Sequence, residues 1–315
     1  HRDRNSSDVA VMYPVESLGT EYYTMCYTPH LDPGNYNHGR NSEFVIVAPF
    51  DTTLVTITTV AEPDGPGQKG VPFTVKLDRG QLYQVQSYEG DFTGSYITSD
   101  KPVAVYSGSL STTIPYEATG GWDHMYEQMP PVKTWGREYY TVPLMTRKRD
   151  FFRVLASQDQ TVYYIGNTKQ RVLQKGEFRE HILTLPERIF SEKPVLIAQF
   201  SQSKNNDNVA NGDGFMVMLS PVSQARNDVT FVAYDSPVIN NYYVNMVVPV
   251  SETGNIELNG SLLPARTFTA YSGGKYAWSQ IQLNQDGPQR LRNVQNPDRG
   301  FVAYVYGYGP YEAYG

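Results

Sequence analysis

The chain has 315 residues, 40% of them hydrophobic, and this length suggests two or three units of about 100–150 residues, each with its own core. The formal net charge of -6 is made of both signs along the whole chain, so nothing favours binding to nucleic acid or to an anionic membrane. No run of about 18–20 apolar residues predicts a membrane span, and the single cysteine, Cys26, excludes an internal disulfide.

The chain opens with a polar stretch, residues 1–8, followed by the apolar segment Val9–Val15. This segment contains a strand-limiting proline and has no counterpart later in the chain, so we expect a spare strand in an N-terminal arm of residues 1–18. Such a strand adds either to the sheet edge of its own unit or to that of a neighbouring chain. The second alternative would produce self-association into a filament.

From residue 43 onward, short apolar or alternating runs are separated by Gly, Pro, Asn and Asp, which is the pattern of β-strands and turns. The predicted strands are EFVIVAPF, TLVTITTV, FTVKL, LYQVQSY, PVAVYSG, FFRVLAS, TVYYIG, PVLIAQF, FMVML, VTFVAY, YYVNMVVPV and FVAYVYGYG. One stretch, GWDHMYEQMPPV, is weakly helical, and Pro130 and Pro131 would stop any turn begun after Asp123. The predicted fold class is all-β.

The same phrases recur along the chain in the same order. GTEYYT matches GREYYT, EFVIVAPFDTTLVTI matches FFRVLASQDQTVYYI, and SDKPVAVYSGS matches SEKPVLIAQFSQS. A fainter third copy contains NNYYVNMVV, GNIELNG and NPDRGFVAYVYG. We therefore predict three tandem, related antiparallel β-sandwich units at residues 19–135, 136–227 and 228–315.

The proline of the repeated phrase, Pro102 in the first copy and Pro194 in the second, has no N–H to donate. We expect each proline at the first residue of a strand, where no ladder hydrogen bond is lost. The residues that follow are apolar on both faces, which predicts a central strand covered by a second sheet. The repeated phrase is therefore interpreted as architectural.

Several of these stretches also carry a resemblance. WDHMYEQMPPVKTWGREYYTVPL, GSYITSDKPVAVYSGS and GFVAYVYGYGPYEAYG resemble the N-terminal domain of the IgGFc-binding protein family. The most specific part is the pattern D-H-x-x-E-Q-x-P-P-x-x-x-W-G, formed by Asp123, His124, Glu127, Gln128, Pro130, Pro131, Trp135 and Gly136. The resemblance implies an extracellular or cell-surface binding or adhesion module without known catalysis. Its partner would be a protein or a glycan, and antibody binding does not follow from the resemblance.

The segment WDHMYEQ also raises the question of an enzyme, because Asp123, His124 and Glu127 together have the side chains for acid–base chemistry. A glycan hydrolase is the distant alternative. The chain has no G-x-S-x-G elbow, H-E-x-x-H helix or phosphate-binding glycine loop. We predict no catalysis and a packed joint between the first two units, formed by Trp122, Asp123, His124, Glu127, Gln128 and Trp135.

Two polar loops were weighed as metal sites. His30, Asp32 and His38 have a spacing that would let them share one ion. A second loop offers oxygen ligands to a hard cation from Asp207, Asn208, Asn211 and Asp213. Neither is a complete signature, and Asn, Asp and Gly clusters are ordinary in turns. We predict no metal and no cofactor.

Two triplets fit the N-glycosylation rule, Asn5-Ser6-Ser7 in the polar arm and Asn259-Gly260-Ser261 at an expected hairpin tip. Asn5 and Asn259 are therefore glycosylation candidates for a secreted glycoprotein.

The last strand, in GFVAYVYGYGPYEAYG, places Tyr304, Tyr306 and Tyr308 on one face by its period of two. One alternative is that both faces pack between sheets and each hydroxyl finds a partner. The other is a partly exposed aromatic ladder suited to a sugar ring or a protein interface. These three tyrosines are the candidate binding residues. The chain is predicted to be an extracellular non-catalytic binding module, with a filament subunit as the main alternative.

Overall fold

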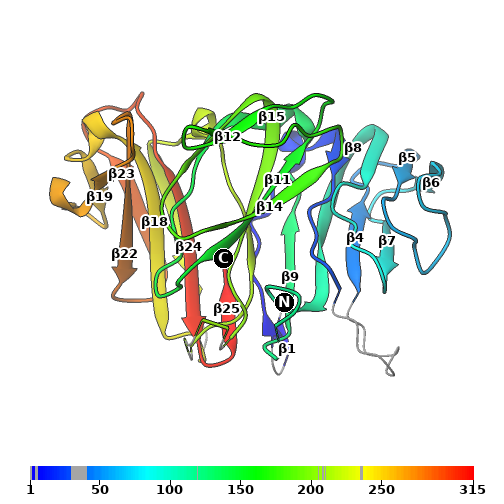
Figure 1. Cartoon of the computed structure of the whole chain (residues 1–315), viewed down its shortest axis with the longest axis horizontal. Helices are drawn as coiled ribbons and strands as arrows, with labels where there is room; N and C mark the ends of the chain where they lie inside the picture. The colour runs from blue at the N-terminus through cyan, green and yellow to red at the C-terminus, as the bar shows by residue number, and fades with distance from the viewer. Residues whose placement is uncertain are drawn as a thin grey trace.

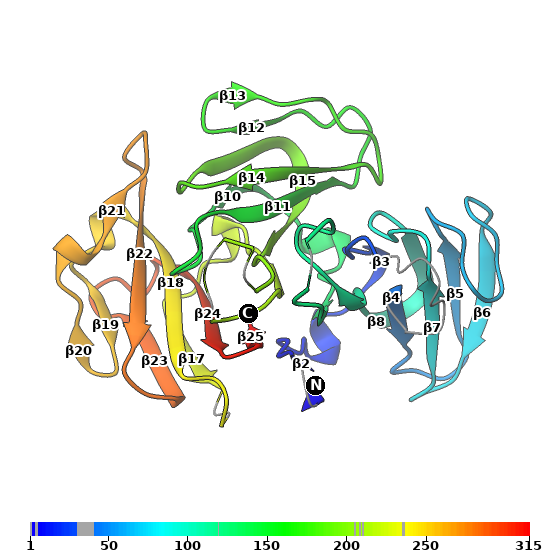
Figure 2. The same cartoon turned by 60° about the horizontal axis from the view of Figure 1, so that its bottom comes forward.

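The structure is a computed structural model of the whole chain, and it describes residues 6–29, 41–118, 120–204, 206–207, 209, 211–234 and 237–315, together with residues 2–3 of the arm. This part of the chain forms 25 strands and five short 3-10 helices, and it has no α-helix. The all-β prediction is therefore confirmed. The sheets form three lobes around a centre that holds both chain ends (Figures 1 and 2).

The first lobe is built around one long strand, β8 (Tyr96–Thr112), which belongs to two layers. Its first part pairs with β3 and β5, and its second part pairs with β4 and β9. One layer thus has the order β6-β5-β8-β3 and the other the order β7-β4-β8-β9. The remaining strands are β3 (Gly19–Tyr23), β4 (Ser42–Val47), β5 (Thr53–Thr58), β6 (Phe73–Leu77), β7 (Leu82–Ser87) and β9 (Asp123–Gln128).

The second lobe repeats this pairing around β15 (Arg188–Phe200), with layers β13-β12-β15-β10 and β14-β11-β15-β16. Its other strands are β10 (Gly136–Tyr140), β11 (Asp150–Ala156), β12 (Tyr163–Ile165), β13 (Thr168–Lys169), β14 (Phe178–Leu183) and β16 (Met216–Met218). All its strands fall within residues 136–218, and those of the first lobe fall within residues 19–128.

The third lobe has the same pairing order, but two strands share the role of the long one. The layers are β17-β23-β19-β20 and β21-β22-β18-β24-β25. Its strands are β17 (Asp228–Ala233), β18 (Asn241–Pro249), β19 (Ile256–Leu258), β20 (Ser261–Leu262), β21 (Thr269–Ala270), β22 (Tyr276–Leu283), β23 (Gly287–Asn293), β24 (Val302–Gly309) and β25 (Glu312–Tyr314). We call the three lobes units 1, 2 and 3.

The two prolines of the repeated phrase do not begin a strand, so that expectation is wrong. Ladder pairs are present up to Ser99 and again from Val103, so Pro102 lies at the corner where β8 passes from one layer to the other. Pro194 lies at the same corner, between the pairs of Ser191 and Val195. A residue without an N–H costs no ladder bond at this corner.

The stretch expected to be weakly helical is also different. Asp123–Gln128 forms strand β9 along the edge of β8, and only Val132–Thr134 forms a 3-10 helix, η2. Asp123, Met125 and Glu127 point to the buried face of β9, so pairing with an open edge and burial of alternate residues override a weak local preference.

The N-terminal arm is not a spare strand, which corrects the expectation for Val9–Val15. The described residues 8–14 have no regular structure, and Val15–Ser17 forms the 3-10 helix η1. Before them, β1 (Arg2–Asp3) and β2 (Ser6–Ser7) pair with each other, and β2 lies against both β9 and β25. The arm therefore bridges units 1 and 3 of its own chain (Figure 2).

Candidate functional site

The joints between units start from a turn that the sequence repeats three times. Pro14, Pro131 and Pro221 each precede a 3-10 helix: η1, η2 and η3 (Val222–Gln224). The backbone angles of the prolines are nearly equal, with φ of -65°, -62° and -68° and ψ of 155°, 148° and 152°. In the sequence, each turn is marked by the dipeptide Pro-Val, with the proline five residues before the residue that opens the unit. This repeat was not among the sequence-based predictions.

The second and third of these turns each pack on the unit before them. Gly19 opens β3, and a Cβ added there would lie 2.5 Å from the Cβ of Pro131. Gly136 opens β10 and is covered by Pro221 in the same way. Glycine is required at both positions because a ring from the next unit occupies the space of a side chain.

A buried tyrosine holds the backbone of each opening glycine. The Gly19 N–H donates to the Tyr22 hydroxyl at 2.7 Å, and that hydroxyl donates to the Val103 carbonyl at 2.7 Å. In unit 2 the Gly136 N–H donates to Tyr139, which donates to the carbonyl of Val195. This explains the repeated G-x-x-Y, whereas Val103 and Val195 take part in these bonds only through their backbone carbonyls.

The joint between units 1 and 2 is centred on a buried arginine. Arg153, on β11 of unit 2, donates from Nη1 to the Asp91 carboxylate at 2.7 Å and to the Cys26 carbonyl at 2.8 Å, both in unit 1. Its guanidinium also lies 4.2 Å from the centroid of the Tyr27 ring. Burial alone would raise the pKa of Asp91, but Arg153 and the Thr93 hydroxyl hold it below its usual value. The apolar core of unit 1 continues into unit 2 around this arginine.

The joint between units 2 and 3 contains the three tyrosines of β24. Tyr306 and Tyr308 are buried, and Tyr304 is half-buried. The Tyr306 hydroxyl accepts the Met145 N–H at 2.8 Å and donates to Asn245 Oδ1 at 2.9 Å, while the Tyr304 hydroxyl accepts the Ser220 N–H at 2.8 Å. The packed alternative thus describes this strand: one face belongs to the core of unit 3 and the tyrosine face lies against unit 2.

The segment between β10 and β11 is held by unit 3 through neutral groups. Asn245 Nδ2 and Gln280 Nε2 donate to the carbonyl of Pro143, and the Tyr271 hydroxyl donates to the carbonyl of Thr141 at 2.9 Å. Asp150 accepts the Leu144 N–H at 2.7 Å, and burial raises the pKa of Asp150 to about 7.

The residues expected to form the first joint are divided by strand geometry. Asp123 and Glu127 lie on the buried face of β9, whereas His124 lies on the other face, with its ring 5.4 Å from that of Tyr126. Side chains on opposite faces of one strand do not converge, so this arrangement does not form an acid–base site.

The two tryptophans and the glutamine of that segment have separate places. Trp135 is buried at the joint, 5.7 Å from the ring of Tyr23, while Trp122 is 43% exposed. The Gln128 side chain accepts the Tyr13 N–H of the arm at 2.6 Å.

The arm also attaches to β9 through a carboxyl group. Asp8 accepts the N–H of Tyr126 and the N–H of Val9, both at 2.8 Å. Burial raises the pKa of Asp8 to about 8 despite these two hydrogen bonds. Burial, and then the nearby Asp8 carboxyl, raise the pKa of Glu127 well above its usual value.

A groove of about 470 Å³ opens on the surface where units 2 and 3 meet. Unit 3 supplies Lys275 and Tyr276, and unit 2 supplies Arg137 and Glu138 from β10. The Glu138 carboxylate accepts Arg188 Nε at 2.8 Å and lies 3.5 Å from Lys275 Nζ. Burial alone would raise the pKa of Glu138, but Arg188, Tyr140 and Lys275 hold it below its usual value. The groove thus presents charges of both signs beside an aromatic ring.

Comparison with known proteins places the whole array in one family. A family model described as IgGFc binding protein matches residues 8–307, which include units 1 and 2, unit 3 as far as residue 307 of β24, and the arm from residue 8. The chain belongs to the IgGFc binding protein family. No curated protein matches it. Within the described residues, no helix has the length and apolar character needed to cross a membrane.

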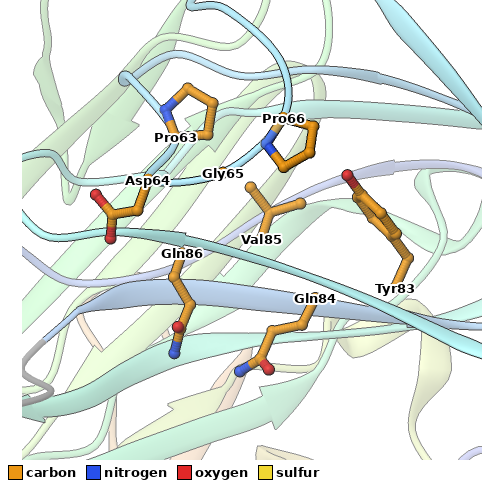
Figure 3. Close-up of a pocket in the computed structure, with 8 residues that line it drawn as sticks. All are labelled: Pro63, Asp64, Gly65, Pro66, Tyr83, Gln84, Val85 and Gln86. Carbon is orange, nitrogen blue, oxygen red and sulfur yellow. The ribbon is translucent and has the colours of Figure 1, made fainter.

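A second, smaller groove of about 230 Å³ lies on unit 1 of this IgGFc binding family chain (Figure 3). The loop Pro63–Pro66 lies across edge strand β7 at this point. Gln84 and Gln86 of β7 both donate to the Glu43 carboxylate, at 2.8 and 2.7 Å. Asp64 is likewise held by the backbone N–H of Tyr88. The Gln84, Gln86 and Asp64 side chains of this groove are thus bonded to their neighbours, which makes it a poorer candidate for a ligand.

The structure describes part of one of the two loops considered as metal sites and none of the ligand candidates of the other. His30, Asp32 and His38 lie outside the described residues, as does Asn208. Asp207 is paired with the buried Arg147 at 3.3 Å, and the carbonyl of Asn211 accepts Arg147 Nη2. Asp213 accepts the N–H groups of Lys204 and Gly214. The described part of this loop is therefore organised around an arginine and backbone donors.

Of the two glycosylation candidates, Asn5 lies outside the described residues. Asn259 is exposed in the turn between β19 and β20, where its φ is 51°. Its side chain accepts the Arg290 N–H at 2.8 Å and donates to Gln289 at 2.5 Å. Attachment of a sugar at Asn259 stays a prediction, and it would replace one of the two hydrogens on this side-chain nitrogen.

Proposed function

We propose that this member of the IgGFc binding protein family is an extracellular, non-catalytic binding module, and that the groove between units 2 and 3 receives a segment of a protein ligand. The observation that carries the proposal is the groove itself. Its volume of about 470 Å³ lies within the range of ordinary ligand sites, and such sites are common where two units meet.

The lining of the groove suits a protein surface. Arg137 and Lys275 are exposed, and the ring of Tyr276 is half-buried, 4.7 Å from the ring of Tyr140. Aromatic residues and arginine are enriched in protein interfaces, and charges at the rim steer a partner of complementary charge. Arg137 and Lys275 are positively charged and Glu138 is the one negatively charged residue of the lining, so this side of the groove is net positive. An acidic or polar segment of the ligand fits this side best.

A glycan ligand is the alternative chemistry for the same groove, since an aromatic ring also stacks on a sugar. We place the module at the cell surface or in the extracellular space because of its family. A filament subunit is less well supported, because the arm that would be donated to a neighbour bridges units 1 and 3 of its own chain.

The test uses two immobilised probes, the Fc fragment of immunoglobulin G, which the family description names, and a mucin glycoprotein. We expect saturable binding of the full chain to at least one probe. Arg137→Glu and Lys275→Glu should each weaken that binding about tenfold, which corresponds to about 1.4 kcal/mol. Pretreatment of the mucin with glycosidases separates a glycan ligand from a protein ligand.

Lys69→Glu is the matched control, because Lys69 is also an exposed lysine and lies in a loop of unit 1, away from the groove. It should leave binding unchanged. Absence of binding to both probes, or equal loss in the groove variants and in the control, would contradict the assignment of this groove.

A further inference from the structure

Residues 19, 136 and 226 hold the same place in the three units. Each follows the proline of its turn by five residues, as Pro14, Pro131 and Pro221 show. Each also pairs with the residue at which the chain enters the second layer of its own sandwich. Gly19 pairs with Val103, Gly136 with Val195 and Arg226 with Phe301.

Only the third of these positions carries a side chain. Gly19 and Gly136 are glycine because the proline of the following unit fills the space where a Cβ would stand. Arg226 is exposed and has no following turn packed on it among the described residues. In units 1 and 2 this position thus accepts the proline turn of the following unit, whereas in unit 3 it carries an exposed arginine.

The other end of the array has the opposite feature. Pro131 and Pro221 are buried in their acceptor units, whereas Pro14 is exposed. Val15, the next residue of that turn, is 45% exposed, and Met12 nearby is 66% exposed. The first turn has the backbone geometry of the other two but no glycine-opened unit covers it.

We propose that Arg226 is a cap that prevents the third unit of one chain from accepting the Pro14–Val15 turn of a second copy. The partner that fits this turn is the uncovered glycine that opens a unit of the same kind. In one copy of this chain the two glycines are already occupied and the third position is arginine. The chain therefore has a donor turn and no acceptor for it, and copies do not join through this contact.

Two physical effects would prevent a proline turn of a second copy from packing on residue 226. Any Cβ at this position would stand within contact distance of an incoming proline ring, as the closeness of Gly19 to Pro131 shows. A guanidinium pressed against the apolar Pro14 and Val15 would also lose water without gaining a partner. The first effect alone predicts that alanine caps almost as well as arginine.

Sedimentation velocity over a wide range of concentration tests the proposal on the full chain. The wild type and Arg226→Ala should sediment as one species at all concentrations. Arg226→Gly should show a sedimentation coefficient that rises with concentration, since a head-to-tail contact of this kind need not close. The double variant Arg226→Gly with Val15→Glu should return to the single species. A folded Arg226→Gly chain that stays a single species would overturn the proposal, as would wild-type association that Val15→Glu abolishes.

A second variant tests within one chain whether arginine at this position excludes a proline turn. Gly136→Arg places the side chain of the third unit at the joint between units 2 and 3. We expect it to open that joint, so that amide hydrogen exchange around Pro221 and η3 rises to the level measured around Pro14 and η1, while exchange in the core of unit 1 stays unchanged. Unchanged protection around Pro221 would show that arginine at this position does not exclude the proline turn.

Discussion

The two joints of the chain solve the same packing problem with different chemistry. Both begin with a proline turn of one unit resting on the opening glycine of the unit before it. Beyond that contact, the joint of units 1 and 2 is built on one buried cation, Arg153. The joint of units 2 and 3 is built mainly on the neutral hydroxyls and amides around Tyr306 and Asn245, while Arg147 lies 4.7 Å from the Tyr308 ring and Lys275 pairs with Glu138 at the surface. Repetition of a fold therefore fixes where units meet but not what holds them together.

This difference predicts different responses to mutation. A buried charge whose partner is removed keeps its full cost of desolvation, so the first joint should fail abruptly. A neutral network loses one hydrogen bond at a time, and the second joint should weaken by steps.

Arg153→Met should lower the free energy of unfolding by about 3–5 kcal/mol, because it leaves the Asp91 carboxylate buried without its cation. Urea unfolding followed by tryptophan fluorescence measures this change. The double variant Arg153→Met with Asp91→Asn removes the Arg153–Asp91 pair and should recover part of the loss, while Glu180, the second partner of Arg153 at 3.0 Å, keeps its charge in both variants. Equal stability of the single and double variants would show that the charge pair does not govern this joint.

Tyr306→Phe should lower the free energy of unfolding by about 1–3 kcal/mol, since it leaves the Met145 N–H and Asn245 Oδ1 without their partner. The same urea experiment applies. Tyr311→Phe is the control, because Tyr311 is 63% exposed and should change nothing. A loss as large as that of Arg153→Met would remove the contrast between the joints.

Asp150→Asn should change how stability depends on pH at the second joint. The carboxyl has a pKa of about 7 in the folded chain, because burial raises it against hydrogen bonds from Leu144 and Gln199 and the attraction of Arg147. The folded state therefore holds more protons than the unfolded state between about pH 4 and pH 7, and stability falls as the pH rises through that range.

The amide of the variant cannot ionise, so its melting temperature should fall less than that of the wild type between pH 4 and pH 7. Thermal unfolding at several pH values measures this. Asp207, which also faces Asp150, is unchanged in both proteins and does not affect the comparison. Parallel curves for the two proteins would show that Asp150 is ionised throughout.

Arg290→Ala gives the smallest expected effect. Arg290 pairs with Asp228 at 2.5 Å on the surface of unit 3, away from both joints, and the two side chains are 54% and 37% exposed. Exposed pairs of this kind contribute little because water screens them. The urea midpoint should stay within error of the wild type, and a clear shift would mean that unit 3 depends on its surface charges more than on its joint.

The sequence was sufficient for those features that depend on periodicity. Alternating residues in stretches such as TLVTITTV and the double match of the corner phrase were enough to predict an all-β chain with repeated units. Strand β23 was not predicted because its sequence, GPQRLRN, is mostly polar. This segment forms a strand because it lies between β17 and β19 and pairs with both. Strand β9 was taken for a weak helix because the open edge of β8 is not visible in local sequence.

The joints depend on contacts between residues far apart in the chain, and these left weaker signals. Nothing near Arg153 in the sequence points to Asp91, 62 residues away. The tyrosines of β24 were identified as one face, but sequence could not decide whether that face was covered. The Pro-Val turn was visible in principle, because it recurs five residues before positions 19, 136 and 226.

The central claim is that two well-packed joints make the three units one body, so that a groove shared by units 2 and 3 keeps its shape. Differential scanning calorimetry of the full chain tests this most directly. The account predicts one cooperative transition whose van't Hoff and calorimetric enthalpies agree, and Arg153→Met should split or lower that transition while Arg290→Ala leaves it in place. Two or three separate transitions in the wild type would contradict the claim, because they would show units that melt independently.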